Sequence, residues 1–166
     1  MRLAPPAPLC DTHRLDDFAC GIPSLDDWLK RRARANQASG ASRSFVLCDG
    51  DAIAGYYALA SGGVEIAGAT GRFRRNMPDP IPVVVLGRLA VSSAYQKKGI
   101  GRALFRDAAL RVLNAADSIG IRGLLVHAIS EEAKAFYLAL GFEPSPIDPM
   151  TLMLTLGDLR AAIATS

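Results

Sequence analysis

A short segment of this sequence combines two glycines with three cationic side chains, and that combination suits a phosphate group. The segment Gln96-Lys97-Lys98-Gly99-Ile100-Gly101-Arg102 follows an apolar run that ends at Val91 and precedes a helical pattern from Ala103 to about Leu113. A loop between a strand and a helix presents free backbone N–H groups at the helix N-terminus, where the helix dipole also favours an anion. Glycine lets the backbone approach a ligand closely. The segment is therefore interpreted as a pyrophosphate-binding loop, with an ordinary loop and helix start as the alternative.

The spacing of the glycines excludes two common nucleotide-binding motifs. A dinucleotide fingerprint requires G-x-G-x-x-G and a Walker P-loop requires G-x-x-x-x-G-K-[ST], and this loop matches neither pattern. It reads Q-x-x-G-x-G, which resembles the acetyl-CoA signature of the GNAT N-acetyltransferases. Two other segments resemble the same family in the same order along the chain. They are the strand-like Leu86-Gly87-Arg88-Leu89-Ala90-Val91 and the pattern A-x-x-F-Y-x-x-x-G-F from Ala133 to Phe142.

The resemblance implies how acetyl-CoA is held. In that family the backbone of the strand before the loop holds the pantetheine arm and orients the thioester, while the amides of the loop bind the pyrophosphate. Many members carry asparagine three residues before the alanine of A-x-x-F-Y, where this sequence has the shorter Ser130. The cofactor-binding residues predicted in this way are Leu89, Ala90, Val91, Gln96, Lys97, Lys98, Gly99, Ile100, Gly101, Arg102, Ser130, Ala133 and Phe136.

Tyr137 is the candidate for donating a proton to the leaving thiolate. Acetyl transfer needs an unprotonated amine, a donor for the developing oxyanion and a proton for the departing sulfur. A phenol with a pKa near ~10 stays protonated at neutral pH and can donate to a thiolate whose conjugate acid titrates near ~8.5. The tyrosine lies in the family's F-Y pair, which favours the catalytic interpretation. The alternative is a core aromatic residue beside Phe136 on an amphipathic helix.

No side chain in the sequence stands out as a general base. His127 lies in an apolar strand pattern and is expected to be a hydrogen-bonded core histidine. Glu131 and Glu132 begin a helix, where carboxylates are favoured by the dipole. An amine of low pKa needs no base, and an α-amino group titrates near ~7.7–8.0 whereas lysine titrates near ~10.4. This difference favours the α-amine of an aminoacyl ester over a lysine side chain.

Segments outside the cofactor motifs resemble a narrower group, the GNAT toxins of bacterial type II toxin–antitoxin modules. The resemblance covers about residues 14–156 and includes Phe18 to Leu29, Gly55 to Leu59 and the N-M-P-D-P-I-P stretch that begins at Asn76. It implies an enzyme that acetylates the free amine of aminoacyl-tRNA and so blocks translation, with a ribbon-helix-helix antitoxin as partner and a homodimer as assembly. A GNAT N-acetyltransferase acting on a small-molecule or protein amine is the alternative. A non-catalytic binding module is a third reading, which the retained Tyr137 disfavours.

The placement of cationic side chains fits an RNA substrate. One set shares the polar face of the first predicted helix, and a second set clusters in a segment that also contains glycines and prolines. Such side chains contact phosphates without reading sequence, and the binding weakens as the salt concentration rises. For each set the alternative is an ordinary solvated surface. The predicted RNA-binding residues are Lys30, Arg31, Arg34, Arg72, Arg74 and Arg75.

The composition limits the class of protein. The 166 residues fit a single domain over 1–166, and the 50% hydrophobic content argues against disorder. The sequence shows no signal peptide and no apolar stretch near the ~20 residues of a membrane span, so no membrane association is expected. Cys10, Cys20 and Cys48 form no C-x-x-C pair, which is typical of free thiols in a reducing cytoplasm. With His13 and His127 as the only histidines, no metal site is predicted.

The elements that must position these residues follow from hydrophobic periodicity and from breakers. We expect a helix capped by Ser24 and ended at Ser39-Gly40, and two strands (44–48 and 53–59) joined at Asp49-Gly50-Asp51. A long loop is expected from 62 to 82, with a short helix inside it as the alternative. There follow a central strand over 83–91, a helix over 99–119, a strand over 124–128, a helix over 131–140 and closing strands over 142–143 and 152–156. The tail after Gly157 is expected to be a short helix or disordered chain.

This order of elements predicts an α/β fold. A hairpin followed by strand, helix, strand, helix and strand gives a mixed, mostly antiparallel sheet flanked by helices. The GNAT fold has the same order, and the resemblance implies a central sheet that is splayed at the acetyl-CoA site.

Overall fold

The computed structural model describes residues 1–164, and residues 165–166, at the end of the predicted tail, lie outside the described part. The chain divides into two compact units: residues 1–60 with 87–108, and residues 61–86 with the chain from 109 onward. The strands β3 (Ala52–Val64) and β4 (Ile81–Val91) and the helix α4 (Ile100–Ala115) contribute residues to both units. The single GNAT domain over 1–166 stays a prediction.

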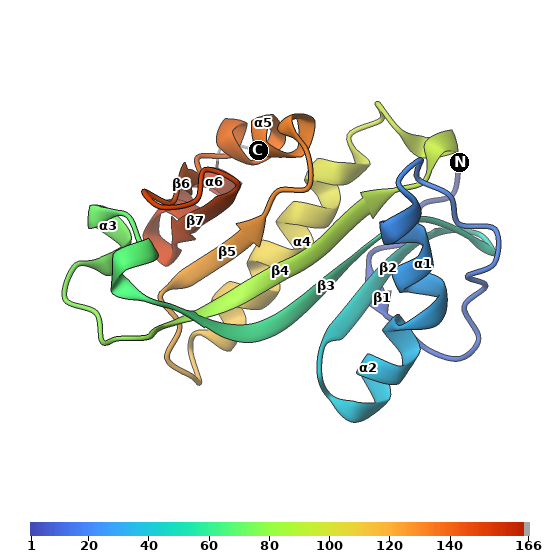
Figure 1. The fold of residues 1–166 in the computed structure, drawn as a ribbon. Helices are drawn as coiled ribbons and strands as arrows, with labels where there is room; N and C mark the ends of the chain where they lie inside the picture. The colour runs from blue at the N-terminus through green and yellow to red at the C-terminus, as the bar shows by residue number, and fades with distance from the viewer. Residues whose placement is uncertain (165–166) are drawn as a thin grey trace. The chain divides into compact units, whose positions relative to one another are not determined.

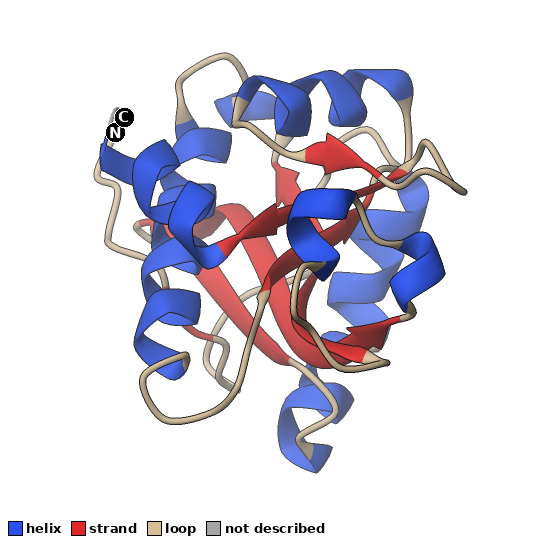
Figure 2. Cartoon of the chain, turned by 90° about the vertical axis from the view of Figure 1, so that its left-hand side faces the viewer, coloured by secondary structure: helices blue, strands red, loops and turns tan. Residues whose placement is uncertain are grey.

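The strands form a mixed, mostly antiparallel sheet, as predicted. Their order is β1-β2-β3-β4-β5-β7-β6 (Figure 1). β4 and β5 run parallel, whereas β1 with β2, β2 with β3, β5 with β7, and β6 with β7 are antiparallel. Figure 2 distinguishes these strands from the helices by colour. The bounds of the remaining strands are β1 Ala7–Pro8, β2 Arg43–Asp49, β5 Gly123–His127, β6 Glu143–Pro144 and β7 Thr151–Thr155.

The first unit is built on the β2–β3 hairpin, whose turn at Gly50 lies where the sequence predicts it. Gly50 has a φ of 59°, a conformation that favours glycine. The core centres on Tyr56, which stacks on Trp28 at 6.1 Å between ring centroids and meets Phe18 edge to face at 5.4 Å. The Tyr56 hydroxyl donates to the backbone oxygen of Leu25 at 2.6 Å. This aromatic cluster packs the N-terminal helices against the hairpin (Figure 1).

The first helix begins two residues earlier than predicted and is broken once. Pro23 occupies its first turn, and the extended Ile22 before it is the N-cap residue, so the prediction of Ser24 as the cap is wrong. Proline fixes a helical φ at the first position and disfavours a helical residue before it, which explains this start. Arg32, at φ −118°, separates α1 (Pro23–Arg31) from α2 (Ala33–Ser39). Gly40 ends α2 at a φ of 83°, as predicted.

Glycine at position 55 allows α4 to pack closely on β3. A Cβ atom at this position would lie 2.8 Å from a methyl carbon of Leu104 and 3.0 Å from the backbone oxygen of Ala90. Any larger residue would have to displace the Leu104 side chain on α4 and would press on the backbone of Ala90 on β4. α4 ends at Ala115, earlier than predicted, and tight i→i+3 bonds from Asp117 and Ser118 follow it. The sequence places Gly120, a residue type that often follows a helix, directly after the predicted end at 119, but the helix ends before it.

In the second unit, part of the predicted long loop is regular structure. β3 continues to Val64, a short 3₁₀ turn η1 spans Ile66–Gly68, and the helix α3 spans Gly71–Arg74. Thr70 caps α3, because its hydroxyl accepts from the backbone N–H of Phe73 at 3.2 Å. The ring of Phe73 is buried in a core with Ile81, Val83, Leu125 and Met153. Burial of Phe73 thus holds α3 on the sheet and leaves its arginines outside.

The last third of the chain follows the predicted order. β5 and β7 pair from Gly123 with Thr155 to His127 with Thr151, and a Cβ at Gly123 would lie 2.0 Å from the backbone oxygen of Leu154. Between them, α5 spans Glu131–Ala139 and ends before Gly141, whose φ is 104°. The tail forms the helix α6 (Leu156–Ala164), the first of the two predicted alternatives.

Candidate active site

The predicted phosphate-binding loop is anchored at its base by Gln96. The Gln96 side chain donates through Nε2 to the backbone oxygens of Val91 and Cys20, each at 3.0 Å. Before it, the 3₁₀ turn η2 (Ser93–Tyr95) is held by a bond from the Tyr95 hydroxyl to Asp49 at 2.6 Å. The end of β4 and the loop are thereby joined within the first unit. Both N–H donors of the Gln96 side chain are therefore engaged within the protein.

The backbone beyond Gln96 takes up a conformation that suits an anion. Lys97 has a φ of 63° and Gly99 a φ of 79°, so the chain enters the left-handed region twice within three residues. Successive amides in such a conformation form a concave nest for negative charge. Gly99 accepts the first helical bond, from Ala103 at 3.1 Å, so the amides of the residues between them belong to the free first turn of α4.

The cations of this loop point to solvent. The side chains of Lys97, Lys98 and Arg102 are exposed, and in the described part of the chain none has a hydrogen-bond or ion-pair partner. A Cβ at Gly99 would meet nothing within 4 Å, so the space above the loop is open. Free amides, a helix N-terminus and unpaired cations together make a site for a diphosphate group.

The second group of predicted residues lies on α5, in the second unit. Ser130 is the N-cap residue of α5, and its Oγ accepts from the backbone N–H of Ala133 at 3.1 Å. One lone pair of this hydroxyl is therefore used to begin the helix. The Phe136 ring meets the Tyr137 ring edge to face at 5.2 Å. The structure thus brings these four residues together on one helix and leaves the Ser130 hydroxyl proton available to donate.

Tyr137 is more deeply buried than a generic surface phenol. Its side chain is 7% exposed and lies between Phe136 and Phe142, the latter at 5.3 Å between centroids. Burial raises the pKa of Tyr137 above its ordinary value, because the apolar surroundings disfavour the phenolate. For an ordinary phenol, transfer of the hydroxyl proton to a thiolate costs little. The observed burial instead makes Tyr137 a firmly protonated hydrogen-bond donor.

His127 is not the core histidine that the sequence suggests. It is exposed at the end of β5, because the buried strand pattern stops at the residue before it. Its Nδ1 lies 2.9 Å from the Thr151 hydroxyl, which lies 2.8 Å from Oδ2 of Asp148. The pKa of Asp148 is lowered, first by the bond from Thr151 and then by the N–H of Met150.

The order of donors in this relay assigns the tautomer of His127. An ionised carboxylate can only accept, so the single hydroxyl proton of Thr151 points to Asp148. The Thr151 oxygen must then accept from Nδ1–H of His127. In the neutral imidazole this leaves Nε2 as the acceptor, on an exposed side chain. Sequence reasoning missed Asp148 and Thr151; the Asp148-Pro149 turn signal was the only cue to them.

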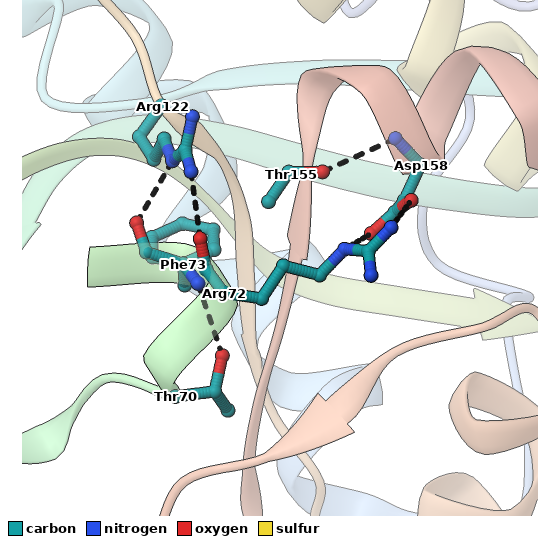
Figure 3. A network of polar contacts seen from close by, with 6 residues as sticks. All are labelled: Thr70, Arg72, Phe73, Arg122, Thr155 and Asp158. Atoms are coloured by element: carbon teal, nitrogen blue, oxygen red, sulfur yellow. Dashed lines mark hydrogen bonds and ion pairs between the residues drawn. The ribbon is translucent and has the colours of Figure 1, made fainter. Parts of the chain in front are cut away.

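The predicted RNA-binding cations differ in how free they are. Lys30 and Arg31 are exposed on α1, whereas Arg34 donates to the backbone oxygens of His13 and Asp11. In the second unit, Arg72 forms an ion pair with Asp158, with 2.8 Å between Nε and Oδ2 (Figure 3). Arg34 and Arg72 are therefore partly engaged within the protein.

Arg74, the last residue of α3, and Arg75 after it are both exposed. The residue that holds this segment is Arg122, which the sequence did not indicate. Arg122 donates to the backbone oxygens of Phe73 and Arg72, at 2.8 and 2.7 Å (Figure 3). These carbonyls end α3 and have no partner inside so short a helix. No pattern in the sequence links Arg122 to a segment about fifty positions away.

Two further features bear on the class of site. Among residues 1–164, no group of histidine, cysteine, aspartate and glutamate side chains is arranged to hold a metal ion. The described helices include none that is both long enough and apolar enough to span a membrane.

Known proteins resemble this chain over nearly its whole length. Residues 40–144 match the family described as acetyltransferase (GNAT) domain. The tRNA-acetylating toxin of Mycobacterium tuberculosis (strain ATCC 25618 / H37Rv) is 52% identical over 158 residues, which cover 95% of each chain. The structure of AtaT complexed with acetyl-methionyl-tRNAfMet superposes with a TM-score of 0.87 at 29% identity and covers 96% of this chain and 98% of its own.

A second solved structure shows the same fold with other molecules bound. It is a tyrosine-to-phenylalanine mutant of the AtaT toxin bound to the C-terminus of the antitoxin AtaR and acetyl-CoA. Its TM-score is 0.83 at 28% identity, and the match covers 99% of both chains.

Proposed function

Because this chain belongs to the GNAT acetyltransferase family, we propose that it transfers the acetyl group of acetyl-CoA to the free α-amine of aminoacyl-tRNA and thereby blocks translation. The observation that carries this proposal is the 52% identity, over 95% of the chain, with a relative named as a tRNA-acetylating toxin. The AtaT structure with acetyl-methionyl-tRNAfMet supports the same acceptor. The structure with acetyl-CoA supports the same donor.

The loop that follows β4 fits the diphosphate of acetyl-CoA. The nest at Lys97 and Gly99 and the free amides of Ile100 to Arg102 supply N–H donors, and Lys97, Lys98 and Arg102 supply charge. Gln96 is proposed as a positioning residue, because it fixes the loop to β4 through Val91. When bound, acetyl-CoA supplies an activated acetyl group as a thioester.

The remaining cofactor contacts are proposed at two places. Backbone N–H groups over Leu89, Ala90 and Val91 are assigned to the thioester and its carbonyl oxygen, where they would stabilise the oxyanion. Ser130, Ala133 and Phe136 are assigned to contacts with the carrier from α5. For Ser130 the capping bond limits the contact to donation of its hydroxyl proton.

Tyr137 is proposed as the catalytic proton donor. The amine nitrogen forms a bond to the acetyl carbon, the carbon–sulfur bond breaks, and the sulfur takes up a proton as it leaves. The Tyr137 hydroxyl is placed on a rigid, aromatic-packed helix and stays protonated, so it can donate to this sulfur. The acceptor amine loses its proton to solvent, which an α-amine of low pKa permits. Solvent returns a proton to the Tyr137 phenolate, and the raised pKa of Tyr137 favours this reprotonation.

The proposed partners follow from the charges and from the related toxins. Lys30, Arg31, Arg74 and Arg75 are exposed and are assigned to tRNA phosphates, with Arg34 and Arg72 contributing less because they are engaged in the protein. A ribbon-helix-helix antitoxin and a homodimer are proposed as the assembly, and the cytoplasm as the compartment, since charged tRNA is there. The AtaT structure bound to the C-terminus of AtaR supports an antitoxin partner.

The test is acetyl transfer with a defined set of acceptors. The purified chain is incubated with labelled acetyl-CoA and, in separate reactions, total charged tRNA, deacylated tRNA, a polyamine and a lysine-containing peptide. We expect label on charged tRNA alone, and amino-acid analysis should place it on the α-amine. Label on the polyamine or the peptide, with none on charged tRNA, would instead establish the small-molecule or protein acetyltransferase.

A further inference from the structure

A hollow in the second unit is lined by arginines from three separate segments. It has a volume of about 710 Å³. Arg72 and Arg75 border it from α3 and the residue after it, Arg122 from the strand entry at β5, and Arg160 from α6. Arg74, the neighbour of Arg75, does not line it. Neither Arg122 nor Arg160 is among the residues that the sequence predicts to bind RNA.

Two of these arginines, Arg72 and Arg122, already have bonding partners within the protein. Arg72 binds Asp158 through both carboxylate oxygens, with Nε at 2.8 Å from Oδ2 and NH2 at 3.1 Å from Oδ1 (Figure 3). Arg122 is fixed by its two bonds to the carbonyls that end α3, and its guanidinium lies 6.0 Å from the Phe73 ring centroid. The charge of Arg72 is balanced by Asp158, whereas Arg122 binds only neutral carbonyls and therefore adds positive potential to the hollow.

The other two arginines are unpaired. Arg75 and Arg160 are exposed, and neither has a hydrogen-bond or ion-pair partner among residues 1–164. The carboxylate that contacts these arginines belongs to Asp158, and it is already paired with Arg72. The N-terminal residues of α6, Leu156 and Gly157, also border the hollow, so the positive end of that helix dipole adds to the same field. Of the four lining arginines, only Arg72 is neutralised by a carboxylate of the described residues, so the hollow carries an excess of positive charge.

We propose that this hollow binds a phosphodiester of the RNA substrate, with Arg75 and Arg160 as the contacting side chains. The inference rests on the proposed function and adds a phosphate subsite to it. Guanidinium groups match the paired oxygens of a phosphate through two parallel N–H bonds. Apolar groups of Met77, Pro82 and Ile121 complete the lining and offer a surface for a ribose or base face.

An RNA backbone fits this arrangement better than an acidic protein segment. Several arginines converge on one concave site, which suits a single group that bears several anionic oxygens. Carboxylates on an extended peptide are spaced along the chain and would each need a separate cation. A peptide strand would also need a free sheet edge, and the edge strand of this unit is β6, whose residues do not line the hollow.

The proposal is tested by charge reversal at the two free positions. Arg75→Glu and Arg160→Glu are compared with Arg2→Glu, an exposed arginine outside the hollow and outside every proposed site. Binding of fluorescently labelled deacylated tRNA is measured across a salt series, and steady-state KM values are measured for aminoacyl-tRNA and for acetyl-CoA. A second acceptor, an aminoacyl-adenosine ester, carries the same amine without a phosphodiester. Unchanged circular dichroism confirms that each variant folds.

The expected result separates RNA contact from chemistry. Each variant should raise the tRNA Kd and the aminoacyl-tRNA KM by about tenfold, and should reduce the slope of log Kd against log salt by about one. KM for the adenosine ester and for acetyl-CoA should stay unchanged, as should every value for Arg2→Glu.

Three results would overturn the phosphate subsite. A tRNA Kd and salt slope equal to those of the wild type would place the RNA elsewhere. A raised KM for acetyl-CoA would mean that the hollow takes a phosphate of the carrier. Loss of antitoxin binding with unchanged tRNA binding would mean that it takes an acidic protein segment. tRNA binding is measured without catalysis. If the wild type failed to acetylate charged tRNA, the proposed function would be refuted, but the binding data would still decide whether the hollow contacts RNA.

Discussion

The loop after β4 and the helix α5 carry the two halves of the proposed chemistry, and they are built in opposite ways. The loop is exposed and rich in charge, and its amides are free because left-handed residues at 97 and 99 turn them outward. α5 presents a phenol that is 7% exposed and enclosed by aromatic rings. Binding of an anion needs accessible donors, whereas proton donation needs a group whose protonation is fixed. The two regions should therefore respond differently to substitution.

The largest effect is expected in the buried half. Tyr137→Phe removes the proton donor and keeps the aromatic packing with Phe136 and Phe142, so kcat should fall by about 10²- to 10⁴-fold. The KM for acetyl-CoA and the melting temperature should change little. Steady-state kinetics and thermal denaturation measure these quantities. Full activity in this variant would remove Tyr137 from the mechanism.

The pH profile sharpens the same point. Burial raises the pKa of Tyr137, so the phenol stays protonated through the alkaline range where an ordinary tyrosine begins to ionise near ~10. Rising pH also deprotonates the acceptor amine. We therefore expect the rate to rise to a plateau and not to fall before about pH 10. A descending limb centred between pH 8 and 9, absent from Tyr137→Phe, would contradict the buried, protonated phenol.

In the loop after β4 the expected effect is on the affinity for acetyl-CoA. Gly99 has a φ of 79°, and valine in that conformation is strained by about 1–3 kcal/mol, so the loop should relax and lose its concave amides. Gly99→Val should weaken acetyl-CoA binding by about tenfold or more, as measured by calorimetry. Gly120→Val is the matched control, because Gly120 has no positive φ and its Cβ would meet nothing within 4 Å. Equal losses in both variants would show that the conformation at Gly99 is not the cause.

A smaller effect is expected at the base of the loop. Gln96→Ala removes two hydrogen bonds, to Val91 and Cys20, and leaves every proposed ligand contact in place. The KM for acetyl-CoA should rise by about 3- to 10-fold, since each such bond contributes about 0.5–1.5 kcal/mol. Hydrogen exchange at the loop amides should quicken in parallel. A raised KM without faster exchange would mean that Gln96 contacts the carrier directly.

The smallest effect concerns the hydrogen bonds from His127 to Thr151 and from Thr151 to Asp148. It is measured by a spectroscopic signal and not by a rate. In the wild type at neutral pH, ¹⁵N spectra should report His127 as the Nδ1–H tautomer, held by Thr151 and Asp148. Thr151→Val removes the acceptor for that proton, so the spectrum should move toward the mixture typical of a solvent-exposed imidazole. A spectrum that is the same in both proteins would mean that the relay does not set the tautomer.

Local sequence patterns predicted both the loop after β4 and the helix α5 close to where the structure has them. The glycines, the basic residues and the F-Y pair stand in local patterns, and hydrophobic periodicity located the main strands and helices. The predicted cap at Ser24 failed because Pro23 moves the helix start, and the long loop was overestimated because β3 continues through two small glycines to Val64. Each of these errors lies at an element boundary, where local propensities compete closely.

Contacts between distant segments were beyond the reach of sequence patterns. The bonds of Arg122 to the end of α3 join positions about fifty residues apart, and the pairing of Arg72 with Asp158 joins positions still farther apart. His127 was misjudged for a related reason. Its strand is apolar, yet the strand ends there and the side chain reaches Thr151 on β7. Such pairings depend on strand order, which one sequence does not specify.

The most direct test of the division between a binding loop and a catalytic phenol is a calorimetric titration of acetyl-CoA into Tyr137→Phe and Gly99→Val, with turnover measured on the same preparations. The account predicts an unchanged Kd with turnover nearly lost in the first variant, and a weakened Kd with kcat largely retained at saturation in the second. Parallel loss of affinity and kcat in both variants would contradict it.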